Sequence, residues 1–195
     1  MNKKKIIASL FSLSAATLLA ACSTNDGDTT NSVESQSVAV ESSMEESDHG
    51  DMVHDESGEI PEGLKVSENP TYQVGDKVEV LTDHMEGMEG AEATVVGAFD
   101  TIAYEISYDP VNGGPRVENH KWVIQEEIED AEEVSFEPGT EVKIKANHME
   151  GMEGATATIE ASEKTTVYMI DYQPTTGGRE IKNHKWVTDM ELSPQ

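Results

Sequence analysis

Residues 84–91 read HMEGMEGA, and residues 148–155 repeat them letter for letter. The same offset of 64 residues carries the segment NHKWV at 119–123 onto 183–187. Because no gap is needed between these anchors, the chain contains a tandem duplication of one small unit. Each copy keeps a histidine, two methionines and two glycines, followed later by a second histidine beside a tryptophan.

Short segments around the repeated motif predict strands. Residues 74–80 (VGDKVEV) alternate apolar and polar side chains, and residues 102–108 (IAYEISY) are rich in aromatic and β-branched side chains. Shorter strands are expected at 93–96, after the repeated motif, and around 116–118, leading into NHKWV. The turn at 109–114 (DPVNGG) combines a proline with Asn-Gly, which tolerates positive φ. The second repeat follows the same order between residues 136 and 192.

This pattern predicts an all-β fold of two tandem small barrels. Four or five short strands in about 60 residues, with no long helical period, suit a closed or half-closed barrel. A unit of that size is near the lower limit for folding without cross-links, so packing between the repeats is expected to contribute to stability. The expected domains are residues 69–131 and 132–195.

The first residues are predicted to be a targeting segment. Three lysines at 3–5 precede an uncharged apolar run at 6–21. That run is shorter than a membrane span of roughly 20 residues and ends in small residues, as a cleaved signal peptide does. Residues 19–22 (LAAC) resemble a bacterial lipobox, which implies a signal peptide at 1–21 and lipidation of Cys22. The alternative is an ordinary secreted protein whose single cysteine stays a free thiol.

Residues 22–68 are predicted to be a disordered acidic tether. They contain almost no aromatic side chains and many Ser, Thr, Asp and Glu, so they bury too little apolar area to offset the entropy of ordering. Within them, the tract from Met44 to His54 contains two methionines, two histidines and several carboxylates. This composition is typical of loose metal-collecting tracts, and an acidic solubilising linker is the equal alternative.

Two family resemblances follow from these motifs. The pattern Gly-Asp-x-Val-x-Val, then glycines, then Ala-x-x-Val is similar to the KOW motif of SH3-like barrels, over one hairpin per repeat. The lipobox, the paired HMEGMEGA motifs, the Tyr-x-Ile-x-Tyr strands, the Pro-x-x-Gly-Gly turns and the NHKWV segments resemble the YdhK family of bacterial lipoproteins, which includes copper-resistance lipoproteins of the CopL type. This second resemblance covers nearly the whole chain beyond the tether. It implies copper binding at the outer face of the cell membrane and protection of the cell from excess metal.

The motif residues themselves favour copper, with Cu(I) as the expected oxidation state. Imidazole and thioether ligands suit soft copper better than calcium or magnesium, and thioethers form no disulfides in an oxidising compartment. Zinc prefers Cys, His and carboxylate ligands. The alternative is that the methionines fill gaps in the core and the histidines lie at the surface. The candidate ligands are His84, Met85, Met88 and His120 in the first repeat, and His148, Met149, Met152 and His184 in the second.

Other functions find less support in the sequence. No nucleophile elbow, phosphate loop or HExxH motif occurs, so the chain is not expected to be an enzyme. A formal net charge of −26 repels phosphate, which argues against a nucleic-acid partner.

Trp122 and Trp186 are expected to anchor the hydrophobic core; the alternative is an indole face over the metal. The expected partners are copper ions, a membrane through the lipid anchor and, as a recipient of the metal, a copper exporter. The remaining alternative is an SH3-like module that binds cell wall or protein without a metal.

Overall fold

The computed structural model describes residues 55–195; the predicted signal peptide, Cys22 and the tract at 44–54 lie outside them. This part of the chain contains eight strands and two 3-10 turns, and none of its helical turns is long and apolar enough to cross a membrane. The all-β prediction is confirmed. In chain order the elements are β1 (Lys65–Val66), β2 (Lys77–Val80), β3 (Glu92–Tyr108), β4 (Val117–Ile124), η1 (Gln125–Glu127), β5 (Glu141–Lys143), β6 (Thr156–Tyr172), β7 (Ile181–Thr188), η2 (Asp189–Glu191) and β8 (Leu192–Pro194).

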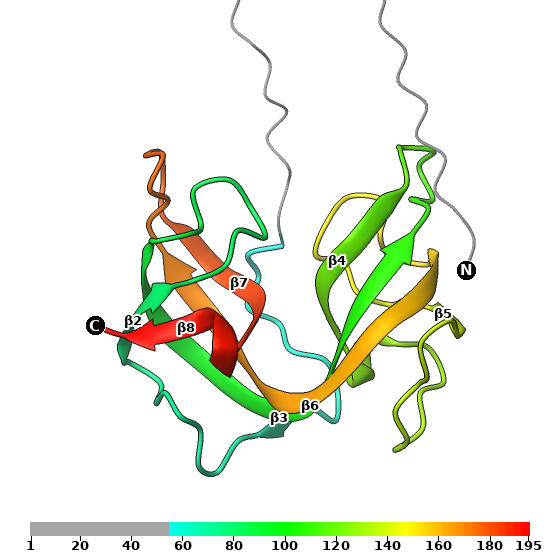
Figure 1. Cartoon of the computed structure of the whole chain (residues 1–195), viewed down its shortest axis with the longest axis horizontal. Coiled ribbons are helices and arrows are strands. Elements are labelled where there is room, and N and C mark those ends of the chain that lie inside the picture. The colour runs from blue at the N-terminus through cyan, green and yellow to red at the C-terminus, as the bar shows by residue number, and fades with distance from the viewer. Residues whose placement is uncertain (1–54) are drawn as a thin grey trace, which may run out of the picture. The chain divides into compact units, whose positions relative to one another are not determined.

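The two longest strands, β3 and β6, hold the fold together. Each is 17 residues long, and they pair antiparallel from Ala93 opposite Tyr172 to Tyr108 opposite Ala157. They form a curved ribbon with a group of shorter strands at either end (Figure 1). Two register shifts interrupt the pairing, and such bulges bend a strand and increase its twist. One strand can therefore contribute to two separate cores.

The continuity of β3 differs from the sequence-based prediction of separate strands at 93–96 and 102–108. The residues between them also pair with β6: Gly97 lies opposite Met169, and Thr101 lies opposite Thr165. Alternation of apolar and polar residues shows which side chains face a core, but it does not identify the strand across the ladder. The joining of the two segments was therefore not visible in the sequence.

Each lobe of the structure takes strands from both repeats. The first lobe contains β2, the first half of β3, the second half of β6, and β7 and β8; the second contains the other halves of β3 and β6 with β4 and β5. The repeats are thus units of sequence, while each lobe is built from both, which the sequence did not predict. The core of the first lobe includes Val78, Val80, Met88, Val95, Tyr168, Ile170, Tyr172, Val187 and Leu192, and that of the second includes Tyr104, Ile106, Tyr108, Val123, Val142, Ile144, Met152 and Ile159.

A third hydrophobic cluster lies near the middle of the β3–β6 ribbon and contains both tryptophans. Trp186 is fully buried and Trp122 is 8% exposed. Trp186 packs edge-on against Phe99, with 5.8 Å between ring centroids. Each tryptophan was expected to anchor the core of its own barrel; both are buried as expected, but they lie together in this shared cluster and in neither lobe core. Its buried members are Phe99, Ala103, Trp122, Ile124, Val167, Met169 and Trp186.

Residues 55–64, which we call the N-terminal strap, are ordered, although the sequence predicted a disordered tether as far as residue 68. The Asp55 carboxylate lies 2.9 Å from the Lys185 ammonium group, and the Glu56 carboxylate lies 2.7 Å from the Arg179 guanidinium. The strap leads into β1, which pairs with β3. The sequence-based reasoning counted apolar area alone, whereas ion pairs and backbone pairing order this segment.

Candidate metal centre

The repeated motif forms a glycine-containing loop between two strands in each lobe. In the first loop, Gly87 and Gly90 have φ values of 76° and 74°, which are accessible to glycine at little cost. The Met88 amide donates to the Met85 carbonyl oxygen at 3.1 Å, so the loop turns between the two methionines. Met88 then points into the core of the first lobe and is fully buried, as is Met152 in the second lobe.

The first motif histidine is held by a glutamate from the other repeat. His84 Nε2 lies 2.8 Å from Glu191 Oε1. The other carboxylate oxygen of Glu191 accepts hydrogen bonds from Trp122 Nε1 at 2.8 Å and from the Thr188 amide at 2.9 Å. Burial alone would raise the pKa of Glu191, but its hydrogen bonds and the charge of His84 outweigh this and hold the pKa below its usual range. The carboxylate is therefore ionised and accepts hydrogen bonds from His84, from Trp122 and from both the amide and the hydroxyl of Thr188.

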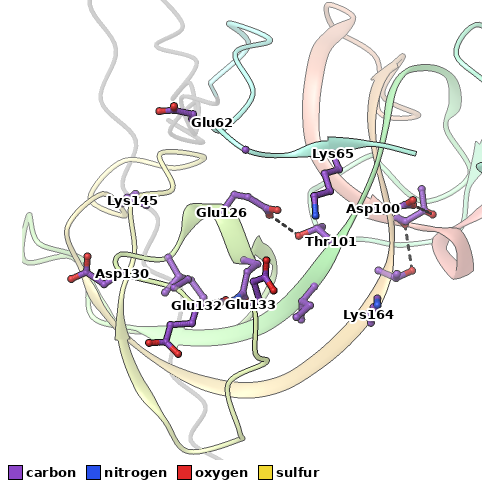
Figure 2. Close-up of a pocket in the computed structure, with 17 residues that line it drawn as sticks. Glu62, Lys65, Asp100, Thr101, Glu126, Asp130, Glu132, Glu133, Lys145 and Lys164 are labelled. Carbon is purple, nitrogen blue, oxygen red and sulfur yellow. Dashed lines mark hydrogen bonds between the residues drawn. The ribbon is translucent and has the colours of Figure 1, made fainter. Parts of the chain in front are cut away.

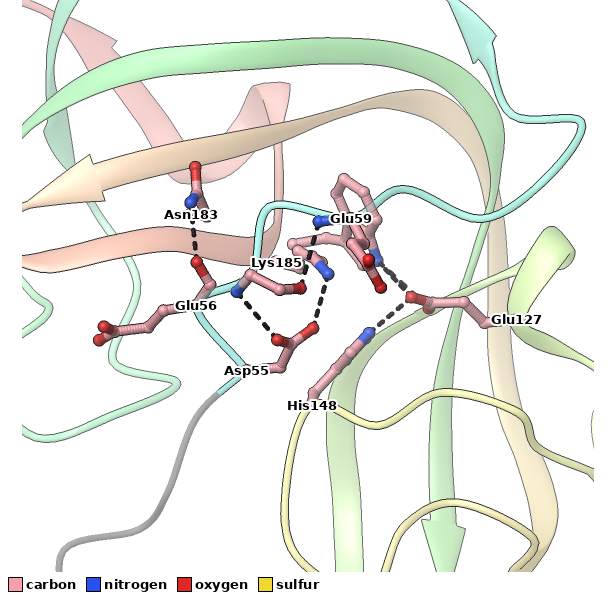
Figure 3. Close-up of polar contacts among 9 residues, drawn as sticks. Asp55, Glu56, Glu59, Glu127, His148, Asn183 and Lys185 are labelled. Atoms are coloured by element: carbon pink, nitrogen blue, oxygen red, sulfur yellow. Dashed lines mark hydrogen bonds and ion pairs between the residues drawn. The ribbon is translucent and has the colours of Figure 1, made fainter.

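The second motif histidine has the same arrangement at positions offset by 64 residues. His148 Nε2 lies 2.6 Å from Glu127 Oε1 (Figure 3). Trp186 Nε1 lies 3.2 Å from both oxygens of Glu127, and the Ile124 amide donates to Oε2 at 3.1 Å. In each lobe, therefore, a glutamate of one repeat connects the motif histidine and the tryptophan of the other repeat.

The other ring nitrogen of each motif histidine has no hydrogen-bond partner. Both His84 Nδ1 and His148 Nδ1 are buried and make no hydrogen bond. An ionised carboxylate can only accept, so Nε2 of each motif histidine carries a proton, and the neutral form of the imidazole has none on Nδ1. Nδ1 then carries a lone pair in a buried position. Such a nitrogen is expensive to bury unless something else occupies its lone pair.

A second histidine approaches each motif from the opposite repeat. The rings of His120 and His148 lie with their centroids 6.3 Å apart. In the first lobe, the Tyr172 ring lies 5.7 Å from the His184 ring, and its hydroxyl donates to Met85 Sδ at 3.8 Å. The histidines that share a lobe are therefore not those of the same repeat. The first lobe contains His84, Met85, Met88 and His184, and the second contains His148, Met149, Met152 and His120.

Histidine, cysteine and carboxylate side chains alone form no metal site among residues 55–195. No group of three or more His, Cys, Asp or Glu that could hold a metal ion occurs within residues 55–195. The motif methionines add thioether donors in each lobe, since Met88 and Met152 lie in the two cores and Met85 packs against the first. That ligand type is the one that selects Cu(I), so the donor set fits copper.

Glu127 and Glu191 are the residues that the sequence-based reasoning missed. They lie in η1 and η2, directly after β4 and β7, in a segment too short for a secondary-structure prediction. A signal was present nevertheless. Residues 124–126 (IQE) and 188–190 (TDM) differ completely between the repeats, yet the following position is glutamate in both.

The strap makes the two lobes unequal. A cavity of about 300 Å³ beside His148 is lined in part by strap residues, among them Asp55 and Ile60. Figure 3 shows Asp55 and Lys185 next to the His148–Glu127 pair. The side chains of His148 and Glu127 are 5% and 6% exposed, whereas those of His84 and Glu191 are 10% and 13% exposed. The second lobe thus holds the more enclosed of the two histidine–glutamate pairs.

A larger groove of about 1300 Å³ lies on another surface. Figure 2 shows that acidic side chains predominate along it. The Thr101 hydroxyl donates to Glu126 Oε2 at 2.6 Å within it. Among the described residues, no histidine or methionine lines this groove, so it is separate from the candidate metal centre. Its charged residues are Glu62, Lys65, Asp100, Glu126, Asp130, Glu132, Glu133, Lys145 and Lys164.

Comparison with known proteins agrees with the duplicated sequence. Residues 74–125 and 138–189 each match the family described as "Protein of unknown function (DUF1541)". The uncharacterized protein YdhK of Bacillus subtilis (strain 168) is 50% identical over 195 residues, covering 99% of this chain and 92% of YdhK.

Two solved structures of the B. subtilis protein are similar to the fold described above. The crystal structure of the DUF1541 family protein ydhK at 2.00 Å resolution is 60% identical, with a TM-score of 0.69, and the match covers 70% of this chain and 93% of that one. The solution NMR structure of the ydhK C-terminal domain is also 60% identical, with a TM-score of 0.61, over 64% of this chain and 94% of that one.

Proposed function

The chain belongs to the DUF1541 family, which includes YdhK, and we propose that it binds and sequesters Cu(I) through one His/Met site in each lobe. The ligands of the first site are His84, Met85, Met88 and His184. Those of the second are His148, Met149, Met152 and His120.

The observation that carries this proposal is the buried, unpartnered Nδ1 of each motif histidine. A copper ion accepts the lone pair that no protein group takes. The hydrogen bond from Nε2 to a glutamate matches the usual surroundings of a metal-bound histidine, which donates its other ring N–H to a carboxylate or carbonyl. Tyr172 supports the site in the first lobe: burial raises the pKa of its hydroxyl, which stays protonated and donates to Met85.

At the level of the cell, we propose a lipoprotein without enzymatic activity. Cys22 is its lipid-bearing residue, and the protein lies at the outer face of the membrane, where it protects the cell from excess copper and passes the metal to an exporter. Its acidic surface concentrates cations nearby. Replacing Cys22 with Ala is expected to move the protein from the membrane fraction to the medium, and unchanged membrane fractionation would contradict the anchor.

Copper loading of the full chain in a Cys22→Ala background, which removes the one thiol, tests the metal site. The protein is mixed anaerobically with Cu(I), desalted and weighed by native mass spectrometry. We expect retained copper in this parent protein and little in a variant with Leu at Met85, Met88, Met149 and Met152. Leucine keeps the approximate volume, so each substitution should cost less than about 1.5 kcal/mol of stability. A folded quadruple variant with unchanged copper content would show that the methionines only pack.

The groove of about 1300 Å³ favours a second candidate function, a module that binds cell wall or protein without a metal. Its polar walls suit a polar partner better than a soft ion. The same loading experiment discriminates between the two functions. A parent protein that leaves the desalting column without copper would favour the module.

A further inference from the structure

We propose that Glu127 and Glu191 are positioning residues that hold the motif histidines in the Nε2–H tautomer, so that Nδ1 faces the copper ion. This inference rests on the proposed function. Neither carboxylate binds the metal in this arrangement. Each instead determines which nitrogen of its histidine is available to bind it.

The hydrogen bonds around Glu191 account for both of its carboxylate oxygens. Its Oε1 faces His84, while its Oε2 accepts from Trp122 Nε1 and from the Thr188 amide. An indole N–H and a backbone amide can only donate. The Trp122 indole and the Thr188 amide therefore each need an acceptor at Oε2. Their hydrogen bonds fix the orientation of the Glu191 carboxylate, whose Oε1 faces His84.

The local structure provides this geometry in both lobes. Each glutamate is the last residue of the 3-10 turn that follows a strand. Its side chain therefore folds back, and its carboxylate accepts from the backbone amide at the end of that strand. Glu127 receives the Ile124 amide in the same way that Glu191 receives the Thr188 amide. Trp122 and Trp186 are packed in the shared central cluster. The indole N–H that donates to each glutamate is therefore held in a fixed position.

Replacing Glu191 by Gln should change the tautomer of His84. The amide oxygen of Gln can still accept from Trp122 and Thr188, but its NH₂ group then points at His84 Nε2. Nε2 must become the acceptor, which moves the imidazole proton to Nδ1. The variant keeps every hydrogen bond and the same side-chain shape, yet it blocks the nitrogen that would bind copper.

The first measurement is the tautomer of each histidine in the copper-free full chain, determined from long-range proton–nitrogen NMR correlations. We expect Nε2–H for His84 and His148 in the parent protein, and Nδ1–H for His84 alone in Glu191→Gln. An Nδ1–H tautomer of His84 in the parent protein would overturn the inference without any variant. Glu127→Gln repeats the test in the second lobe, so a folding failure of one variant leaves the other.

The second measurement is Cu(I) affinity by competition with a chromophoric Cu(I) chelator. Mutation of the hydrogen-bond partner of a metal-binding histidine typically costs 10–100-fold in metal affinity, and we expect a decrease of about that size at one of the two sites in Glu191→Gln. The matched control is Asp189→Asn, two residues away, whose carboxylate accepts from Tyr168; its affinity should stay at the parent value. A folded Glu191→Gln protein with the Cu(I) affinity of the parent would overturn this inference but not the proposed function. A parent protein that binds no Cu(I) would overturn the proposed function, and this inference with it.

Discussion

Met85 and Met88 lie three residues apart in one loop but in different surroundings. Met88 is fully buried in the core of the first lobe, whereas Met85 is partly buried and its sulfur accepts the Tyr172 hydroxyl. Packing and metal binding are therefore not alternatives for Met88, because a buried thioether can do both. Met85 is packed less tightly, so we expect its replacement to affect metal binding more than stability.

Mutations at these two positions should separate packing from binding. We expect Met88→Ala to lower the free energy of unfolding by about 2–5 kcal/mol, because it leaves a cavity in a closed core. Met85→Leu should change it by less than about 1.5 kcal/mol while weakening Cu(I) binding. Urea unfolding followed by tryptophan fluorescence measures the stabilities. Equal stability of Met88→Ala and the parent protein would contradict the assignment of Met88 to the core.

Single residues were partly predictable from the sequence. The duplication and the ligand softness of the motif select the candidate histidines and methionines, and their binding role remains a prediction. The pairing of His120 with His148 was not predictable, because it depends on the exchange of strands between the repeats. Glu127 was missed because a carboxylate next to a short turn has no distinctive pattern until its hydrogen-bond partners are known.

Among the elements, the N-terminal strap depends on one ion pair more than on apolar contacts. Lys185 is only 7% exposed, and Asp55 supplies its carboxylate. Burial alone would raise the pKa of Asp55. Hydrogen bonds from the Ser57 amide and from Lys185, together with the charge of Lys185, outweigh burial and lower the pKa to about 2. The folded pKa is thus below the unfolded value of 3.8, so the contribution to stability is present above pH 3.8 and is lost as the pH falls through about 2.

The Asp55→Asn variant should therefore loosen the strap at neutral pH. The substitution leaves the Lys185 charge without its partner, and we expect a cost of about 1–3 kcal/mol, between the values for exposed and buried pairs. Hydrogen exchange at residues 55–64, followed by mass spectrometry at pH 7, should increase. Asp109→Asn is the control, because its pair with Arg116 is exposed and far less should change. Unaltered exchange in Asp55→Asn would contradict the ion-pair account of the strap.

Strands were the most predictable elements, and their connections the least. The strands at 77–80, 117–124 and 141–143 correspond to predicted segments, because alternation and turn residues act locally. The continuous β3 was not predicted, because its middle residues are ordered by pairing with β6, which lies in the other repeat. Local sequence contains no information about such a distant partner.

For the whole molecule, the exchange of strands makes the two repeats depend on each other. Each lobe core contains residues of both repeats, and the central cluster contains both tryptophans. A single repeat can form neither core. Its buried apolar surface would face water, which costs about 25 cal/mol for each Å².

Separate expression of the repeats tests this dependence. We expect the fragments 69–131 and 132–195 each to lack the sheet signal in far-ultraviolet circular dichroism. The chain 55–195 should unfold in a single transition, with the same urea midpoint by circular dichroism and by tryptophan fluorescence. A folded, monomeric single repeat would contradict the strand exchange, and two separate transitions would show that the lobes unfold independently.

X-ray absorption at the copper K-edge shows whether both sulfur and nitrogen bind the copper ion, as proposed. The sample is the full chain with Cys22→Ala, loaded with Cu(I), so that methionine is the only source of sulfur. The account predicts a Cu(I) edge with both sulfur and imidazole nitrogen bound directly to the metal. It also predicts loss of the sulfur contribution when Met85, Met88, Met149 and Met152 are all replaced by Leu. Copper bound by nitrogen and oxygen alone would contradict this proposal.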